Sequence, residues 1–408
     1  KIAGWVSSQR YLGKLVFILL RDMHGSIQLK CEPPANVEED DISKALRDLT
    51  IESIIAVRGV VAKRPPEMIN EKLKSGDLEV VVSQYELLNP SALPPFDLRA
   101  DKLANEELRL KYRFLDLRRP ALQRNILLRS RVAQITRNYF WDNGFTEVET
   151  PTLFKATPEC GAKEFLVPTR DRGKFYALPQ SPQQYKQITM ASGIDKYFQL
   201  ARCYRDEGIH PDRQPEFTQV DLEISFARPN DIYKTIEGLL KAIWKKELGV
   251  DIPTPFPHMQ FEEAMSKYGI DKPDTRYALH IKDITSTLQQ SNTSVKLFKE
   301  SIQQGHRIKC INFKSLAANI TNEEVTTLVN EAKKAGAKDL LVIKLVDGEW
   351  KNPIAKHLSE QEKSQLAKEL DAQNGDLLCM SIGNHYAACS ILGKVRIAGA
   401  TMMKNKSL

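Results

Sequence analysis

The residues best suited to chemistry lie in one stretch of the sequence, between Tyr197 and Phe226. Two β-rich runs there flank a loop that extends from Gly208 to Gln214. Because the side chains of a strand alternate between its two faces, the second run separates into an apolar and a polar face. The apolar face has Val220, Leu222, Ile224 and Phe226, and the polar face has Phe217, Gln219, Asp221, Glu223 and Ser225. The sequence therefore predicts a hairpin whose apolar face packs on a core and whose polar face lines a cleft.

The first run of this hairpin adds a cation to the same cleft. Arg205 shares a face with residues that leave room for a ligand because they are small or polar: Gln199, Ala201 and Cys203. A cleft lined by Arg, Asp, Glu and Gln suits a ligand with a polyphosphate at one end and a zwitterion at the other. A half-exposed hairpin with ordinary surface charges has the same spacing, so spacing alone leaves both interpretations open.

A long helix and a short strand precede the hairpin and are expected to position it. Apolar residues recur at helical spacing between residues 125 and 143, which predicts a helix with one stripe facing a partner. The stripe is Leu128, Val132, Ile135 and Tyr139. Gly144 then ends the helix, and residues 145–151 read as a strand closed by proline.

The N-terminal residues 1–88 have the pattern of a small β-barrel. The β-rich runs are Ile2–Ser8, Leu15–Leu20, Ser26–Cys31, Ser53–Val61 and Leu78–Leu88. A helical patch, Asp41–Leu49, follows the third run, and five strands with a helix after the third is the order of an OB barrel, a common oligonucleotide-binding fold. The proline-rich segment of residues 89–95 then forms a stiff linker.

The remaining part, residues 257–396, mixes strands and helices and indicates an inserted α+β module. The expected strands are Ile308–Phe313, Leu340–Leu345 and Leu377–Ile382, and the expected helices are Asn322–Ala335 and Ser359–Leu370. No internal repeat or low-complexity tract occurs.

Composition is typical of a globular protein of two to four domains. The chain has 408 residues, of which 42% are hydrophobic and 27% charged. Its apolar runs fall far short of the roughly 20 residues of a membrane helix, so no membrane association is expected. Six cysteines lie far apart without a Cys-x-x-Cys pair, which favours a reducing compartment and no zinc knuckle.

The charge distribution allows two interpretations. The net charge is +7, and residues 99–131 hold ten Lys or Arg against four acids. This bias is typical of a surface that tracks phosphates. A solvated helix face would have the same bias.

The hairpin sequence is similar to motif 2 of class II aminoacyl-tRNA synthetases in two segments, Tyr204–Glu207 and Arg213–Asp221. Residues 125–151 resemble motif 1, the dimer-forming element of that class. Segments that resemble the aspartyl, asparaginyl and lysyl subgroup are Gly4–Val6, Phe17–Asp22, Leu115–Arg119, Thr157–Glu159 and Ala177–Lys186. Residues 257–396, with Lys267–Asp274, resemble the insertion of bacterial and mitochondrial aspartyl enzymes, which lysyl and asparaginyl enzymes lack at this place.

The resemblance implies an α+β multidomain fold. Its parts are an OB-fold anticodon-binding domain (1–88), a linker or hinge (89–120), a class II catalytic domain with motifs 1 and 2 (121–256), a bacterial-type insertion domain (257–396) and the start of a return to the catalytic domain (397–408). The antiparallel catalytic sheet, flanked by helices, would be incomplete here. Motif 3 is missing, so the chain is interpreted as a fragment.

The resemblance also implies an aspartate–tRNA ligase, which activates L-aspartate with ATP and transfers it to tRNA-Asp. Arg205 and Glu207 would be catalytic. Arg205 would grip the α-phosphate and the aspartate carboxylate, while Glu207 would accept from the adenine amino group. The other ATP-binding residues would be Asp206, Gln214 and Phe217, the last by stacking. Mg²⁺ is expected on the phosphates, with unknown ligands.

Further residues would bind aspartate and the anticodon. Glu159, Gln183 and Asp221 would hold the substrate ammonium, and Lys186 would pair with the side-chain carboxylate. In the barrel, Phe17 would stack on an anticodon base, and Arg10, Gln28 and Glu79 would read base edges. Taken singly, Phe17 is equally well a core residue.

The remaining expectations concern assembly, compartment and alternative functions. A homodimer is expected through the motif 1 helix and strand. Because bacterial relatives tend to be acidic and the start of this basic chain looks trimmed, the mitochondrial matrix is favoured over a bacterial cytoplasm. A tRNA-binding paralogue without catalysis, or a general single-strand-binding barrel protein, would account for part of the sequence.

Overall fold

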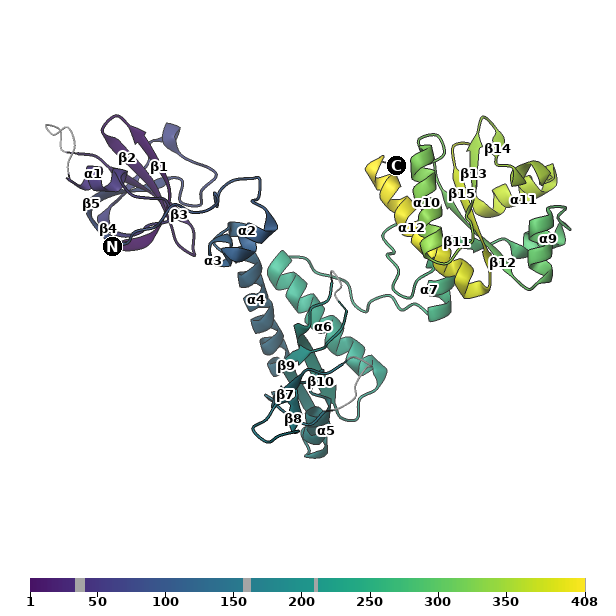
Figure 1. The fold of residues 1–408 in the computed structure, drawn as a ribbon, viewed down its shortest axis with the longest axis horizontal. Helices are drawn as coiled ribbons and strands as arrows, with labels where there is room; N and C mark the ends of the chain where they lie inside the picture. Colours follow the sequence, from purple (N-terminus) through teal and green to yellow (C-terminus); the bar gives the residue numbers. More distant parts are fainter. Residues whose placement is uncertain (34–40, 157–162, 209–211, 408) are drawn as a thin grey trace. The chain divides into compact units, whose positions relative to one another are not determined.

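The structure is a computed structural model that describes residues 1–33, 41–156, 163–208 and 212–407. The chain divides into two compact units, Lys1–Thr254 and Pro255–Leu408. Both units combine helices with β-sheets, which confirms the predicted α+β class (Figure 1).

The first unit begins with a closed five-stranded barrel, in the strand order β1-β2-β3-β5-β4 (Figure 1). The strands are β1 (Ile2–Leu12), β2 (Leu15–Arg21), β3 (Ser26–Cys31), β4 (Ile54–Lys63) and β5 (Leu78–Asn89), with α1 (Asp41–Arg47) after β3 and a 3₁₀ turn (Pro66–Met68) after β4. The predicted OB fold is confirmed. β1 is longer than predicted because Gly13, with φ of +58°, allows a tight turn that pairs Leu12 with Leu15.

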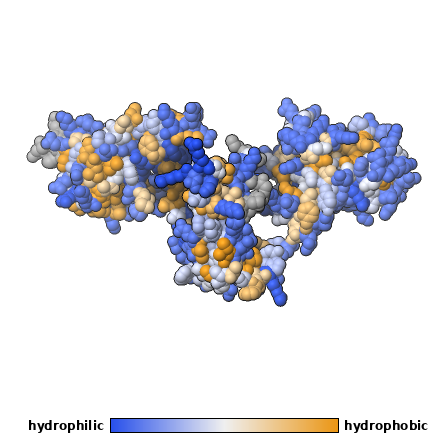
Figure 2. Space-filling view, turned by 60° about the horizontal axis from the view of Figure 1, so that its bottom comes forward, coloured by the Kyte–Doolittle hydropathy of each residue, from blue (hydrophilic) through white to orange (hydrophobic). Residues whose placement is uncertain are grey.

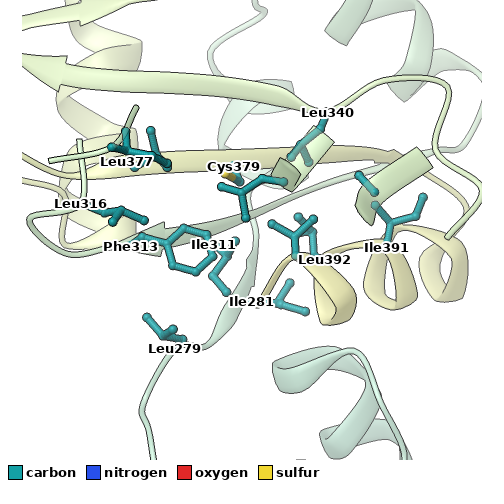
Figure 3. Close-up of a cluster of buried hydrophobic side chains, with 14 of the residues drawn as sticks. Leu279, Ile281, Ile311, Phe313, Leu316, Leu340, Leu377, Cys379, Ile391 and Leu392 are labelled. Carbon is teal, nitrogen blue, oxygen red and sulfur yellow. The ribbon is translucent and has the colours of Figure 1, made fainter. Parts of the chain in front are cut away.

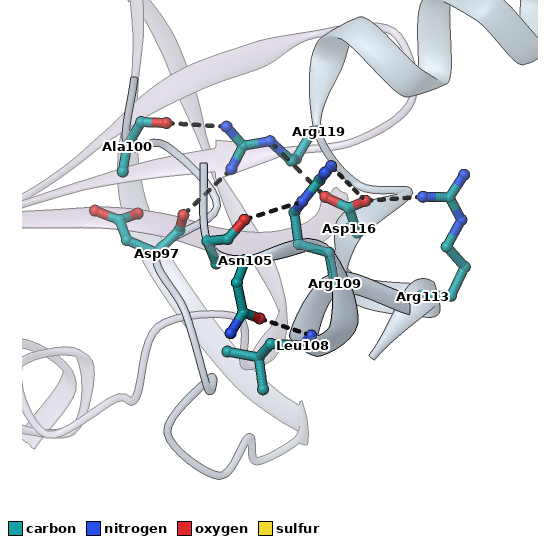
Figure 4. A network of polar contacts seen from close by, with 9 residues as sticks. Asp97, Ala100, Asn105, Leu108, Arg109, Arg113, Asp116 and Arg119 are labelled. Carbon is teal, nitrogen blue, oxygen red and sulfur yellow. Dashed lines mark hydrogen bonds and ion pairs between the residues drawn. The ribbon is translucent and has the colours of Figure 1, made fainter. Parts of the chain in front are cut away.

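A short helical segment follows the barrel and contains a buried carboxylate. The helices are α2 (Glu106–Lys111) and α3 (Arg113–Asp116). Asp116 is fully buried and accepts from the guanidinium groups of Arg113 at 2.9 Å and Arg109 at 3.5 Å (Figure 4). Arg119 donates to the backbone oxygen of Ala100 at 2.9 Å (Figure 4).

Most arginines of the basic region 99–131 are therefore bound to the protein's own groups. Those with such partners are Arg99, Arg109, Arg113, Arg118, Arg119, Arg129 and Arg131. The guanidinium groups paired with the buried carboxylates of Asp116 and Glu52 are poor candidates for tracking phosphates, because their departure would leave a buried charge unpaired. Only Arg109, Arg118 and Arg119 are partly buried, and the other basic residues of this region are exposed, so both interpretations from the sequence remain open.

The rest of the first unit is a sheet covered on one face by two long helices. The sheet order is β10-β9-β6, with β6 (Thr146–Glu147), β9 (Lys196–Tyr204) and β10 (Glu216–Ile224). The helices are α4 (Pro120–Asp142) and α6 (Pro229–Leu248); a small hairpin of β7 (Leu166–Pro168) and β8 (Phe175–Ala177) leads to α5 (Gln183–Ala191). Between helices and sheet, Phe140, Phe145, Phe198 and Leu239 form a buried core.

Two boundaries in this part differ from the prediction. Helix α4 begins five residues earlier, at Pro120, because proline is favoured in the first turn, where its missing N–H costs no hydrogen bond. The strand expected at residues 145–151 shrinks to β6, which pairs with β9 only at Thr146 and Glu147.

The second unit is a five-stranded sheet with a core on each face. The order is β11-β12-β15-β13-β14, with β11 (Ile281–Asp283), β12 (Arg307–Phe313), β13 (Leu341–Val346), β14 (Glu349–Lys351) and β15 (Leu377–Gly383). Its helices are α7 (Phe261–Tyr268), α8 (Thr285–Gln290), α9 (Lys296–Gln303), α10 (Asn322–Lys334), a 3₁₀ turn (Ile354–His357), α11 (Glu360–Leu370) and α12 (His385–Asn405). In Figure 3, Phe313 and Ile311 of the sheet lie side by side and face Leu392 of α12.

The sequence predicted the elements with strong local signals and missed α12. α10 begins at the predicted residue and α11 one residue later than predicted, and Thr321 and Ser359 cap them in reciprocal capping boxes. Residue 396 was expected to end the inserted module, but α12 continues through it without interruption. Met402 and Met403, near the end of α12, pack on the core of the same unit.

The surfaces mix hydrophilic with scattered hydrophobic side chains (Figure 2). Within the described residues, no helix is long and apolar enough to cross a membrane.

Candidate active site

The hairpin of β9 and β10 has the two faces that alternation predicted, except that Val220, expected on the packed face, is 44% exposed and lies outside the core. Cross-strand partners place Gln199 opposite Asp221 and Cys203 opposite Phe217, so these side chains share one face. On the other face, Leu222 and Ile224 pack against the core formed with α4 and α6.

The apolar face ends earlier than predicted. Phe226 was expected on it, but this residue lies beyond the end of β10 and is 96% exposed. Its φ of +59° turns the chain out of the strand before the alternation reaches it. The assignment of Phe226 to the packed face was therefore wrong.

A buried lysine lies on the polar face between two carboxylates. The ammonium of Lys186, on α5, is 3.0 Å from Asp221 Oδ1 and 3.2 Å from Glu223 Oε2. The Lys186 and Asp221 side chains are only 11% and 7% exposed, while that of Glu223 is 38% exposed. Burial lowers the pKa of Lys186, but the hydrogen bonds and charges of Asp221 and Glu223 outweigh it, so the pKa lies above its usual value. Lys186 is therefore a firmly charged group in the cleft.

Asp221 retains capacity for a further cation. Its Oδ1 accepts from Lys186, whereas its Oδ2 is buried and has no hydrogen-bond partner. A buried carboxylate oxygen without a donor is costly, and a bound ammonium group would satisfy it.

Arg205 follows β9 directly and lies over the aromatic ring of Phe217. The guanidinium carbon is 5.2 Å from the ring centroid, and the backbone N–H of Arg205 donates to Pro215 O at 2.9 Å, which extends the hairpin. Its Nη2 is 3.5 Å from Gln180 O, and its Nε is buried without a partner. Arg205 thus retains donors for an anion in the cleft.

The other expected nucleotide-binding residues lie on exposed segments at the hairpin's open end. Glu207 accepts from the Arg213 guanidinium at 3.0 Å across the loop. Asp206 donates its backbone N–H to Lys163 O at 3.0 Å, and Gln214 is exposed.

Two further residues, Gln183 and Glu159, are expected to bind aspartate, and the structure describes only the first. Gln183 is the first residue of α5, one turn before Lys186, and is partly exposed. Glu159 lies outside the described residues.

Two features of the cleft were not assigned from the sequence. Glu223 was placed on the polar face but given no role, since its contact with Lys186 joins residues 37 positions apart. Tyr197 donates to Gln199 Oε1 at 2.8 Å, and Thr150 donates to the same oxygen at 3.0 Å. Burial, followed by the charge of Asp221, raises the pKa of Tyr197, so its hydroxyl remains a donor.

The four residues expected to bind the anticodon lie on the outer face of the barrel. Phe17 is half-buried between the inward-facing Val16 and Ile18, and its directly opposite partner on β1 is Arg10, which is exposed. Phe17 is thus outside the barrel core. Gln28 donates to Glu79 Oε2 at 2.9 Å across β3 and β5.

Within the described residues, no three His, Cys, Asp or Glu side chains gather closely enough to hold a metal ion.

Comparison with known proteins defines the class of this fold and site. A family described as an OB-fold nucleic acid binding domain matches residues 1–88, and one described as tRNA synthetases class II (D, K and N) matches residues 105–384. The structure also resembles asparaginyl-tRNA synthetase from Pyrococcus horikoshii, with a TM-score of 0.57 over 97% of this chain and 93% of that chain. Sequence identity to that protein is 18%, so the likeness concerns the fold alone.

Closer relatives narrow the family. An aspartate–tRNA(Asp/Asn) ligase from Opitutus terrae is 46% identical over 99% of this chain, which covers 67% of the relative. The mitochondrial aspartate–tRNA ligase of Dictyostelium discoideum is 43% identical over the whole chain, which covers 61% of the relative. The chain belongs to the aspartate–tRNA ligases of the class II tRNA synthetases.

Proposed function

We propose that this chain forms the anticodon-binding part and much of the active site of an enzyme that activates L-aspartate with ATP and transfers it to tRNA-Asp. The observation that carries this proposal is the cleft of β9 and β10. There, a buried Lys186 and a buried Asp221 with an unsatisfied oxygen lie on the same hairpin face as Arg205. A ligand with two carboxylates and one ammonium group matches these charges.

Aspartate would bind by charge complementarity. Asp221 Oδ2 would accept from the substrate ammonium, assisted by Gln183 and Glu159, and Lys186 would pair with the side-chain carboxylate. Asparagine has no negative charge at that end, so it would leave the buried ammonium of Lys186 with a weaker partner. Rejection of a ligand that leaves a buried polar group poorly paired is the stronger form of selectivity.

ATP would extend from Arg205 toward the open end of the hairpin. Phe217 would stack on adenine, Glu207 would accept from its amino group, and Asp206 and Gln214 would contact the nucleotide. An oxygen of the aspartate α-carboxylate then bonds to the α-phosphorus while the bond to the pyrophosphate leaving group breaks. Arg205 would stabilise the charge that develops on the phosphate oxygens in this step.

Mg²⁺ would arrive with ATP, since this ion typically binds through substrate phosphates and one or two carboxylates. It would neutralise phosphate charge, and the protein ligands remain to be assigned.

The barrel would bind the anticodon loop. An exposed cation and a half-buried ring on neighbouring strands, Arg10 and Phe17, suit a looped-out base that stacks on the ring. Gln28 and Glu79, which already contact each other, would read base edges.

A homodimer and a compartment complete the proposal. The first turns of α4 expose apolar side chains that a second copy would cover: Ile126, Leu127 and Leu128 are 53%, 39% and 38% exposed.

The relatives include bacterial proteins and a mitochondrial one. We favour the mitochondrial matrix over a bacterial cytoplasm because the chain carries a net charge of +7. Mass measurement in solution tests the dimer, and tagging of the full-length protein in its own cell tests the compartment.

The decisive experiment for the activity is ATP–pyrophosphate exchange with the full-length protein, run separately with aspartate, asparagine and lysine. Exchange with aspartate alone supports the proposal. Exchange with asparagine or lysine in place of aspartate, or with none of them, contradicts it.

A further inference from the structure

Lys30 lies on the outer face of the barrel beside the residues proposed to bind the anticodon. Phe17 is directly opposite Arg10 on β1 and directly opposite Lys30 on β3. Directly opposite side chains share a face of the sheet, with Cβ atoms about 4.5–5.5 Å apart. The ring of Phe17 is therefore flanked by a cation on each side.

The neighbouring row of the same face differs in chemistry. Leu19 is opposite Gln28, which is opposite Glu79, so that row has an amide and a carboxylate. The Phe17 row continues from Lys30 to Val81 and has no acceptor side chain. Donors and acceptors together suit base edges, whereas cations on either side of a ring suit the phosphates that flank a stacked base.

In the absence of RNA, Lys30 forms an ion pair with Glu32, the residue that follows the end of β3. Its ammonium is 2.9 Å from Glu32 Oε2, and the side chains are 27% and 56% exposed. The hydrogen bond to Glu32 raises the pKa of Lys30 despite partial burial, so the lysine is charged at neutral pH. An ion pair this exposed adds little to folding stability, and its partners can separate at low cost.

We infer that Lys30 binds a backbone phosphate of the RNA strand whose base stacks on Phe17, and that Glu32 occupies Lys30 until the RNA displaces it. The inference rests on the proposed role of the barrel in anticodon binding. A phosphate and the Glu32 carboxylate compete for one ammonium, so the two members of the ion pair have opposite effects on RNA affinity.

The test is the affinity of the full-length protein for a tRNA-Asp transcript, measured between about 50 and 300 mM salt. Lys30→Met should weaken binding several-fold and reduce the slope of log affinity against log salt by about 0.7–1, the value of one phosphate contact. Glu32→Gln should strengthen binding about two- to fivefold, because it removes a competitor worth no more than an exposed ion pair. The matched control is Lys63→Met, on β4, which is hydrogen-bonded to neither β2 nor β3; it should leave the slope unchanged.

Opposite effects of the Lys30 and Glu32 variants support the inference, because a merely structural ion pair would change affinity in the same direction from either side. No change in either variant, or weakening in both, overturns it. Phe17→Ala distinguishes the role of Lys30 from the anticodon role of the barrel. If Phe17→Ala weakens binding and Lys30→Met does not, only the Lys30 inference fails; if neither weakens binding, the anticodon role of the barrel fails as well.

Discussion

The cleft of β9 and β10 and the outer face of the barrel are both polar faces created by strand alternation, but their charges differ in burial. In the cleft, the Lys186 and Asp221 side chains are 11% and 7% exposed. On the barrel, Arg10 is exposed and Lys30 pairs with a half-exposed carboxylate. Buried charges act on a ligand through a low effective dielectric, whereas exposed charges are screened by water and salt. In the proposed function, small-ligand selectivity would rest on a few buried groups, and RNA binding on several exposed ones.

The largest effect is expected from Arg205→Gln in the full-length enzyme. This substitution removes the charge proposed to contact the reacting phosphate, so adenylate formation should lose roughly 3 kcal/mol or more of transition-state stabilisation. Binding of tRNA should change little, because the barrel is a separate surface. Pyrophosphate exchange measures the first effect and a tRNA titration the second; normal exchange in this variant would contradict the role of Arg205.

Lys186→Met should weaken aspartate binding by about 1.5–3 kcal/mol, the range for hydrogen bonds to charged groups. The discrimination between aspartate and asparagine should fall with it. Exchange rates measured over a range of both amino acids give this ratio, and an unchanged ratio would exclude Lys186 as the selectivity residue.

The Lys186 ion pair also predicts a pH dependence of stability. Its pKa is raised in the folded protein, so the pair stabilises fully below the unfolded pKa of about 10.4 and is lost as pH rises through the folded value. The difference in unfolding free energy between wild type and Lys186→Met should therefore be constant from about pH 7 to 9 and shrink above about pH 10.4. Urea titrations at several pH values measure it. A difference that shrinks on acidification toward pH 7 would contradict the assignment.

Phe17→Ala should weaken tRNA binding by about 1–3 kcal/mol, the range for base–aromatic stacking. Its cost in folding stability should stay below the roughly 3–5 kcal/mol of a core aromatic truncation, because Phe17 is half-buried and outside the barrel core. Thermal melting recorded beside the tRNA titration checks both. A variant that melts early and binds tRNA normally once folded would refute the anticodon role.

The smallest effect is expected from a surface pair with nearly the same geometry as that of Lys186. Lys174 is 3.1 Å from Asp171, against 3.0 Å for Lys186 and Asp221, but its pair is 72% and 70% exposed. Lys174→Met should change unfolding free energy by less than about 1 kcal/mol and leave exchange unaltered. If Lys174→Met lowered the unfolding free energy as much as Lys186→Met does, burial would not be the property that separates the two regions.

Local signals in the sequence predicted much of this fold. Alternation identified the cleft face of the hairpin, and β-rich runs separated by turn residues predicted the OB order. The helices α10 and α11 were predicted within one residue of their observed bounds, and the structure shows a capping box at the start of each. Each of these features is specified by residues a few positions apart.

The features that the sequence did not predict depend on distant contacts. α12 is apolar on several sides because it packs against the sheet, α7 and α10, so it lacks the single stripe that identifies a surface helix. The contact of Glu223 with Lys186 requires α5 to lie over the hairpin, which no local spacing reveals. The internal partners of the arginines around Asp116 are likewise visible only in three dimensions (Figure 4).

The most direct test of the separation between the two regions is pyrophosphate exchange by the Phe17→Ala variant of the full-length enzyme, at saturating aspartate and ATP and without tRNA. Phe17 is in the barrel, a different sheet from that of the cleft residues, so the exchange rate should equal that of the wild type while the dissociation constant for tRNA-Asp rises. An exchange rate that falls together with tRNA affinity, in a variant that melts at the wild-type temperature, would contradict the account.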